Sequence, residues 1–271
     1  MSLVKTARPF RLGTTSFIYP DHIVPNVEKL GPQFDEIELL IFESKPIEYL
    51  PPKADIDTLA RLSQALSVTY NIHLPTDISL SHGSKKEREA GIDTVERVMA
   101  LVAPLAPTTH TLHLDFTAQD RAAGKEGIKR WQERAINSLD RLAARVTDPR
   151  LITIETLDFP PEILFPVLDN CPMSLCIDAG HLIKYGYDIA ALFERYQSKI
   201  PLIHFHGVDF SFNPSKDHQG LDKTPMERVA PTLGVLKQFT GVVSLEVFNL
   251  ENLTASVAWM ANHFFAETNF R

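Results

Sequence analysis

Eight strand-like segments alternate with helical segments along the whole chain, and this alternation constrains the fold more than any other feature. The strand-like runs cover residues 11–17, 36–43, 68–74, 109–114, 151–156, 173–177, 201–206 and 241–247. Strands that alternate with helices form a parallel sheet covered by the helices. Eight such units in 271 residues favour a closed (β/α)8 TIM barrel, an α/β fold in which residues 1–271 would form one domain.

The main alternative for such a pattern is an open, doubly wound sheet. The first strand-to-helix turn lacks a G-x-G-x-x-G phosphate loop, which weakens the dinucleotide-binding form of that fold. We expect helices at about 21–30, 55–66, 84–102, 120–146, 189–196, 225–239 and 253–265, with a short helix near Pro161. Residues 207–225 are expected to form a long loop.

The composition is that of an ordinary globular chain, with 44% hydrophobic and 23% charged residues. No apolar run is long enough to cross a bilayer, and the first residues lack the features of a signal peptide. We therefore expect a cytoplasmic protein with no membrane partner. The net charge of −7 disfavours nucleic acid as a partner, because phosphate contacts need clustered Lys and Arg. The negative charge does not exclude a small phosphorylated substrate held by metal ions.

The segment 175–181 reads as a buried strand that ends at Asp178, turns at Gly180 and presents His181. At least five other predicted strands also end in His or Glu. Side chains alternate across a strand, and in these strands the large apolar residues share one face while the polar residues share the other. Because the apolar face packs on the helices, the polar set should point to the barrel axis. Its ionisable members lie at the C-terminal strand ends, where barrel active sites are built.

Carboxylates and imidazoles gathered at one barrel mouth need a partner, and divalent metal supplies it. The proposed ligands are His73, His113, Glu155, Asp178, His181, His204, His218 and Glu246. Zinc is the first choice, with manganese or iron as alternatives, because these ions accept imidazole and carboxylate ligands together. Glu155 is placed to bridge two metals. Catalytic roles are assigned to Glu155, Glu246 and His218, since a bound metal makes hydroxide available near neutral pH.

Three further residues are candidates for contacts with the substrate. His206 shares the inward parity of His204, so either imidazole could be the ligand from the seventh strand. Glu43 lies at the end of the second strand with parity opposite to that of Glu38, and is the better candidate of the two for substrate contact. Asp217 lies in the expected long loop after the seventh strand.

The order of several short motifs resembles that of the xylose-isomerase-like barrel superfamily, which includes endonuclease IV. These motifs are H-L-P at 73–75, L-H-L-D at 112–115, I-E-T at 154–156, I-D-A-G-H at 177–181, H-F-H at 204–206 and L-E-V-F at 245–248. The resemblance implies a (β/α)8 barrel with divalent metals at its mouth, and the endonuclease's zinc ligands would fall on the eight ligands named above. The endonuclease carries an Asp two residues before the late loop His. Here that position is Lys216, so the resemblance does not decide whether a third metal is bound.

A narrower resemblance, to the cobamide-remodelling phosphodiesterases, covers more detail. It rests on R-L-G-T-T-S-F-I-Y-P at 11–20, E-L-L-I-F-E at 38–43, H-L-P at 73–75, H-L-D at 113–115 and D-H at 217–218. The resemblance implies hydrolysis of the phosphoester in the nucleotide loop of corrinoid cofactors, with release of a cobinamide-type product. The partner would then be a small-molecule corrinoid. The lower-base preference and the oligomeric state are not determined by the sequence.

Two other functions compete with this hypothesis. A sugar isomerase or epimerase would use one metal and two carboxylates flanking a substrate carbon, for which Glu155 and Glu246 are suited. The many imidazoles disfavour it, because they indicate more than one metal. A corrinoid- or metal-binding carrier without turnover is the third possibility, since the apolar, aromatic segment 208–212 is suited to gripping a ligand.

Overall fold

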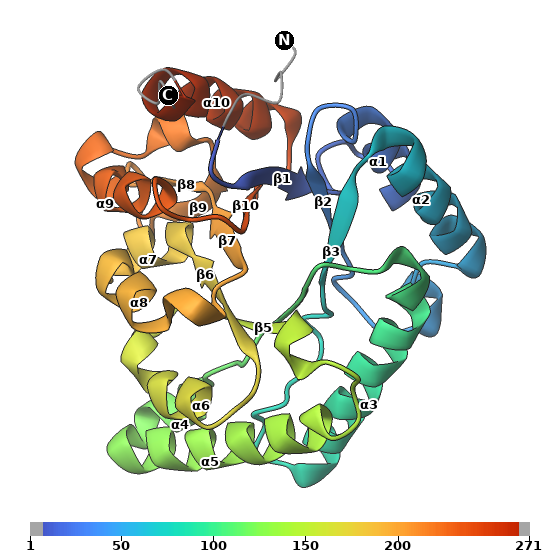
Figure 1. Ribbon diagram of the computed structural model, residues 1–271. Coiled ribbons are helices and arrows are strands. Elements are labelled where there is room, and N and C mark those ends of the chain that lie inside the picture. The colour runs from blue at the N-terminus through green and yellow to red at the C-terminus, as the bar shows by residue number, and fades with distance from the viewer. Residues whose placement is uncertain (1–7, 266–271) are drawn as a thin grey trace.

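Eight parallel strands close into a barrel in the computed structural model of the protein, which describes residues 8–265 (Figure 1). The barrel strands are β1 (Arg11–Thr15), β2 (Glu36–Leu40), β3 (Thr69–His73), β4 (His110–Leu112), β5 (Ile152–Glu155), β6 (Ser174–Asp178), β7 (Leu202–Phe205) and β10 (Val242–Leu245). They follow one another around the barrel in chain order, and β10 closes the ring by pairing with β1. The predicted TIM barrel is therefore confirmed, and its extension over residues 1–271 as one domain stays a prediction.

Helices surround this ring of strands (Figure 1). They are α1 (Ile23–Leu30), α2 (Lys53–Leu66), α3 (Lys85–Val102), α4 (Ala118–Ala122), α5 (Gly124–Ala143), α6 (Phe165–Asp169), α7 (Ala179–Tyr185), α8 (Ile189–Tyr196), α9 (Met226–Leu236) and α10 (Leu250–Met260), which continues as a π-helical turn, Ala261–Phe265. The 3₁₀ turns are Ile47–Tyr49, Ala103–Leu105, Pro149–Leu151, Pro161–Ile163, Gln197–Lys199 and Leu221–Lys223. Among these described helices, none combines the length and apolarity needed to span a membrane.

The two faces of the barrel strands differ as the alternation of polar and apolar residues predicts. On β3, Tyr70 and Ile72 are fully buried, and the Tyr70 hydroxyl donates a 2.9 Å hydrogen bond to the carbonyl of Leu59 on α2. The apolar face therefore packs on the helices. On the same strand, Asn71 points into the barrel and donates to the carboxylate of Glu36 on β2.

A buried polar network fills the end of the barrel at which the strands begin. Glu36 Oε1 accepts hydrogen bonds from the Asn71 amide and the Thr108 hydroxyl, both at 2.9 Å, and an Arg11 guanidinium nitrogen lies 3.1 Å from Oε2. Glu36 is completely buried, so these partners replace the water that its charge would otherwise require. The Glu36 carboxylate is therefore satisfied without a bound cation.

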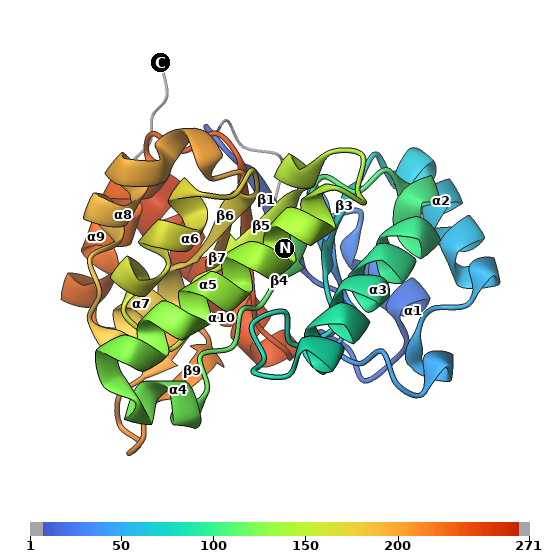
Figure 2. The same cartoon turned by 90° about the horizontal axis from the view of Figure 1, so that it is seen from below.

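Two segments differ from the sequence expectation. Helix α7 begins directly after β6, where only a turn was expected. The segment expected as a long loop, 207–225, instead contains an antiparallel hairpin of β8 (Gly207–Asp209) and β9 (Lys216–Gln219), followed by a 3₁₀ turn. These strands are short and β9 is wholly polar, so they lack the apolar alternation by which strands are recognised. Figure 2 shows β9 at the same end of the barrel as α4.

The base of this hairpin is fixed by a close backbone approach. Gly207 pairs with Gln219, and a Cβ on Gly207 would lie 2.0 Å from the carbonyl oxygen of Gly220. Only glycine fits at 207, because any side chain would force the two arms apart. The hairpin therefore leaves β7 in a defined direction.

The loop between β1 and α1 is held by one buried side chain. Asn26 on α1 accepts hydrogen bonds through Oδ1 from the backbone N–H groups of Ile18 (3.1 Å) and Tyr19 (2.9 Å). Its amide nitrogen lies 3.0–3.2 Å from the carbonyl oxygens of Tyr19, Asp21 and His22. A single asparagine thus substitutes for the regular backbone pairing that the loop lacks.

Replacing Asn26 with Ala should lower the free energy of unfolding by about 2–4 kcal/mol, because two backbone donors and several carbonyls lose their partner in a buried site. Urea denaturation followed by circular dichroism measures the loss. The control is Asn170→Ala, because that exposed amide makes one hydrogen bond, to the carbonyl of Pro166. The control should stay within about 0.5 kcal/mol of the wild type. Equal, small losses in both variants would contradict the role of Asn26.

Candidate metal centre

The end of β6 and the start of α7 place two ionisable groups beside each other. Asp178 is the N-cap of α7, and its Oδ1 accepts a 2.8 Å hydrogen bond from the backbone N–H of His181. The Nδ1 atom of His181 lies 2.8 Å from Oδ2 of the same carboxylate. Gly180, between them, leaves room for an imidazole: a Cβ there would lie 2.1 Å from the ring of His206. The Asp-Ala-Gly-His run therefore combines a helix cap, a close approach and a donor.

Four buried side chains form what we call the carboxylate group: Glu155, Asp178, His204 and Glu246. One donor atom from each lies within 4.8 Å of the others. His204 is at its centre, with Nδ1 2.9 Å from Glu155 Oε1 and 3.3 Å from Glu246 Oε2. On its other side, His204 Nε2 lies 3.0 Å from Oε1 of Glu38. Several carboxylates therefore surround one imidazole in the barrel interior.

Two further imidazoles approach the second oxygen of Glu155. His113 Nε2 lies 2.8 Å from Glu155 Oε2, and His73 Nε2 lies 3.5 Å from the same atom. We call His73 and His113 the imidazole pair. The Nδ1 atom of His73 faces the carbonyl of Leu74 at 3.0 Å, which directs Nε2 toward Glu155. Glu155 consequently has one oxygen toward the carboxylate group and the other toward the imidazole pair.

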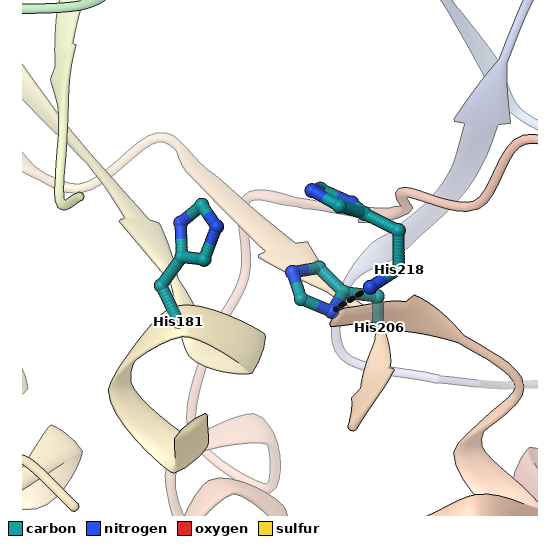
Figure 3. A group of neighbouring side chains, drawn as sticks. All are labelled: His181, His206 and His218. Carbon is teal, nitrogen blue, oxygen red and sulfur yellow. Dashed lines mark hydrogen bonds between the residues drawn. The ribbon is translucent and has the colours of Figure 1, made fainter. Parts of the chain in front are cut away.

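The histidine triad, His181, His206 and His218, forms a third group at the mouth (Figure 3). His181 lies opposite the other two rings, which are tilted by 32° against each other with their centroids 4.1 Å apart. His218 has a left-handed backbone, with φ of 51°, and its Nδ1 lies 3.1 Å from the carbonyl oxygen of Glu246. The hairpin thus brings a residue from β9 back over the end of β10.

His206 has two contacts that need opposite tautomers. Its Nδ1 lies 3.0 Å from both the carbonyl oxygen of Gly207 and the backbone N–H nitrogen of His218. As an acceptor from His218, Nδ1 leaves the hydrogen on Nε2, which then donates to Asp178 Oδ1 at 3.1 Å. As a donor to Gly207, it leaves Nε2 of the neutral ring free to bind a cation.

Divalent metal ions fit among these side chains, because several of the side-chain donor atoms are unpaired. Within the described part of the chain, Glu38 Oε1, His204 Nε2, Glu246 Oε2 and His181 Nδ1 are buried and have no partner in hydrogen-bonding geometry. Buried polar atoms are normally paired, and unpaired ones are costly. Divalent cations among these atoms would supply the missing partners, and the mixture of imidazole and carboxylate suits zinc, manganese or iron.

All eight predicted ligands lie together at the mouth of the barrel. They are His73, His113, Glu155, Asp178, His181, His204, His218 and Glu246, and they divide among the three groups described above. Their roles as ligands stay predictions. His204 and His206, considered alternatives from one strand, both reach the site: His204 belongs to the carboxylate group and His206 to the histidine triad.

The residues predicted to contact the substrate differ in their burial and in their partners. Glu43 is exposed and lines a rim cavity, whereas Glu38, the residue set aside, is completely buried against His204. The register of β2 against β3 carries the missing signal, because Glu38 pairs with the inward-facing Asn71. Asp217 is tied to Lys184 of α7 by a 2.6 Å ion pair, a partner that sequence reasoning missed.

The sequence profile of the family described as xylose isomerase-like TIM barrel matches residues 24–263. The chain belongs to this family. A search of curated proteins finds no match.

Several solved structures share the fold of this xylose isomerase-like barrel. A D-tagatose 3-epimerase-like protein superposes with a TM-score of 0.77 at 17% identity, over 95% of this chain and 97% of that chain. The 3-keto-D-glucoside 4-epimerase from E. coli gives 0.67 at 14% identity, over 93% and 99%. Endonuclease IV from Thermus thermophilus gives 0.66 at 18% identity, over 93% and 99%. At these identities the likeness establishes the fold alone.

Carboxylate neighbours raise the pKa of two imidazoles of this xylose isomerase-like barrel, His73 and His181, when no metal is bound. Burial lowers the pKa of His73, but hydrogen bonding and charge from Glu155 outweigh it and raise the pKa to about 9. Burial also lowers the pKa of His181, but the charge of Asp178 and its hydrogen bond outweigh burial and raise this pKa to about 10. Burial raises the pKa of Glu155, yet the positive His204 and its neighbours hold it well below the ordinary value.

His218 behaves in the opposite way. Burial and the neighbouring positive charge of His206 lower its pKa below 6.5. His218 is therefore neutral at pH 7, unlike His181. A neutral imidazole is the form that binds a metal or accepts a proton.

Replacing Gly180 with Ala should displace the His206 ring, because the new methyl group would overlap it. We expect a lower melting temperature and a shift of the His206 ring signals in the NMR spectrum. The control is Gly234→Ala in α9, where nothing lies within 4 Å of the new Cβ. There the better helix propensity of alanine should stabilise the protein by about 1 kcal/mol. If both substitutions stabilised the protein equally, the close contact at Gly180 would be refuted.

The metal-free protein should be most stable between about pH 4.5 and 6.5. The raised pKa values of His73 and His181 give stability that is complete below 6.5 and is lost as the pH rises through about 9 and 10. The depressed pKa values of Glu155 and Asp178 give stability that is present above 4.5 and 3.8 and is lost as the pH falls. Melting temperatures of chelator-treated protein across this pH range provide the measurement. A melting temperature that rose steadily from pH 6.5 to 10 would contradict it.

Proposed function

We propose that this xylose isomerase-like barrel is a metal-dependent hydrolase that cleaves the phosphodiester in the nucleotide loop of cobamides. The proposal rests on the division of Glu155 between two donor groups. Its Oε1 lies 2.9 Å from His204 in the carboxylate group, and its Oε2 lies 2.8 Å from His113 in the imidazole pair. A carboxylate in this position suits a site with more than one cation, and such sites favour phosphoryl transfer because charge develops on both the attacking and the leaving oxygen.

The three groups indicate which residues would hold cations. The imidazole pair would share one cation with Glu155, and the carboxylate group would hold a second. The histidine triad offers a third position, in which His206 supplies a donor where the resemblance to endonuclease IV would require an acidic residue and the chain has Lys216. Bound divalent cations would neutralise phosphoryl charge and lower the pKa of coordinated water.

The chain's own residues would control protons and water at this centre. His218 is neutral at pH 7, so its free ring nitrogen is available close to the mouth either to a cation or, where no cation occupies it, to a proton. Lys184 lies 2.6 Å from Asp217, which in turn lies 3.7 Å from His181 Nε2, and this chain of contacts orients the triad from its outer side. Glu38 lies behind His204, with its Oε1 3.0 Å from Nε2 of that ring.

The choice of a cobamide as substrate is supported by the position of the motif at residues 11–20. Its first half is β1, and its second half is the loop pinned by Asn26, which lies at the same end of the barrel as the metal centre. Phe17, in this loop, is half exposed beside the site. An exposed aromatic ring at a catalytic mouth favours a substrate with a large apolar part.

A sugar epimerase is the second candidate. One structurally similar protein is described as a 3-keto-D-glucoside 4-epimerase and another as D-tagatose 3-epimerase-like. The carboxylate group alone has the composition of a one-cation site, with Glu155 and Glu246 on either side of His204. The imidazole pair and the histidine triad favour the hydrolase, because a one-cation epimerase would leave them without a ligand. Product analysis with a panel of ketoses separates the two functions.

Replacing Glu155 or Glu246 with Gln should reduce cobamide hydrolysis by at least about a hundredfold, because each amide removes a negative donor from the centre. Chromatography of the corrinoid products measures the loss, and elemental analysis should show a lower metal content in Glu155→Gln. The matched control is Glu251→Gln on the exposed surface of α10, which should keep full activity.

Full activity in Glu155→Gln or Glu246→Gln would remove the assigned roles. Wild-type protein that binds metal but leaves cobamides uncut would exclude the hydrolase and favour either the epimerase or a corrinoid carrier. Isomerised ketose in the same preparation would identify the former.

A further inference from the structure

Three phenylalanines form an aromatic cluster at the rim of the barrel mouth: Phe17, Phe42 and Phe248. They meet edge to face, with ring centroids 5.7 Å (Phe17–Phe42), 6.5 Å (Phe17–Phe248) and 6.1 Å (Phe42–Phe248) apart. Phe17 is 50% exposed and Phe42 is 36% exposed. The three residues follow the ends of β1, β2 and β10, so the cluster is assembled by the fold rather than by one loop.

The aromatic cluster is continuous with the metal centre. The ring of Phe42 lies 6.5 Å from that of His73 in the imidazole pair. The ring of Phe248 lies 4.7 Å from that of His218 in the histidine triad and is tilted by 36° against it. A molecule bound at the centre would therefore reach the aromatic cluster without leaving the mouth.

A cavity of about 500 Å³ adjoins the outer side of the cluster, and Phe17, Phe42 and Tyr49 line it. This volume falls within the usual range for small-molecule sites. Glu43 and Glu48 also line the cavity, and Asp21, a third acidic residue there, is paired with Lys29. No Lys or Arg is among the described residues that line it. The cavity therefore disfavours anions and accepts hydrogen bonds.

We propose that the aromatic cluster and this cavity form a subsite for the large ring system of the substrate, whose hydrogen-bond donors face Glu43 and Glu48. The placement of the phosphodiester at the metal centre rests on the proposed function. The division of charge supports the arrangement: the phosphodiester belongs with the cations, and the acidic cavity excludes it. The exposed ring faces supply the apolar contact that a large ring system needs.

Binding of adenosylcobalamin to the chelator-treated protein tests the subsite without turnover. Equilibrium dialysis with detection by visible absorbance gives the Kd. The double variant Phe17→Ala/Phe42→Ala should bind at least about tenfold more weakly, because both exposed ring faces are removed. The matched control is Phe212→Ala, which removes a similarly exposed ring, 47%, from the hairpin tip, where it packs on Lys216. The control should bind like the wild type.

A second variant guards against loss of folding. Phe17→Leu/Phe42→Leu keeps apolar bulk but removes the aromatic faces, and it should also weaken binding while its melting curve stays cooperative. The subsite would be overturned if the wild type bound no corrinoid, or if the double variants bound as tightly as the wild type.

The same experiment separates this inference from the proposed function. Wild-type protein that binds the corrinoid through Phe17 and Phe42 but never cleaves it would end the hydrolase proposal and leave the subsite standing. Hydrolysis with an unchanged KM in the double variants would end the subsite and leave the hydrolase standing.

Discussion

The burial of several carboxylates in one barrel mouth is the constraint on which the rest of this structure depends. Glu38, Glu155, Asp178 and Glu246 are almost completely removed from solvent and lie around shared imidazoles. Such a concentration of negative charge is costly unless protons or cations neutralise it. The raised pKa values of His73 and His181 show how protons can do so, and the unpaired atoms beside them show where cations would replace those protons.

The scaffold around the centre is arranged to keep these groups in place. At the opposite end, Glu36 is neutralised by Arg11 and accepts hydrogen bonds from neutral donors, so its carboxylate needs no cation. At the mouth, by contrast, the partners of the carboxylates are mainly imidazoles, which can exchange a proton for a metal. The barrel therefore separates a structural acidic network from a chemically adaptable one along the same set of strands.

Much of the site can be predicted from the sequence, because alternate residues of a barrel strand face either the barrel axis or the helices. Residues such as His73, Glu155 and Asp178 lie at strand ends with their side chains on the inward face. Alternation alone therefore predicts that they gather at the barrel mouth. Glu38 could not be chosen over Glu43 in this way, because only the register of β2 against β3 shows that Glu38 faces Asn71. The β8–β9 hairpin and α7 were missed because short polar strands and a helix of seven residues carry little periodic signal.

The glycine-clamped hairpin has a consequence for how such a barrel can diversify. His206 and His218 lie at the base of the hairpin, where Gly207 locks the two arms together, whereas residues 210–215 lie beyond the clamp. Length and composition can therefore drift at the tip while the imidazoles keep their spacing. In this architecture the locked base protects the chemistry from changes at the tip.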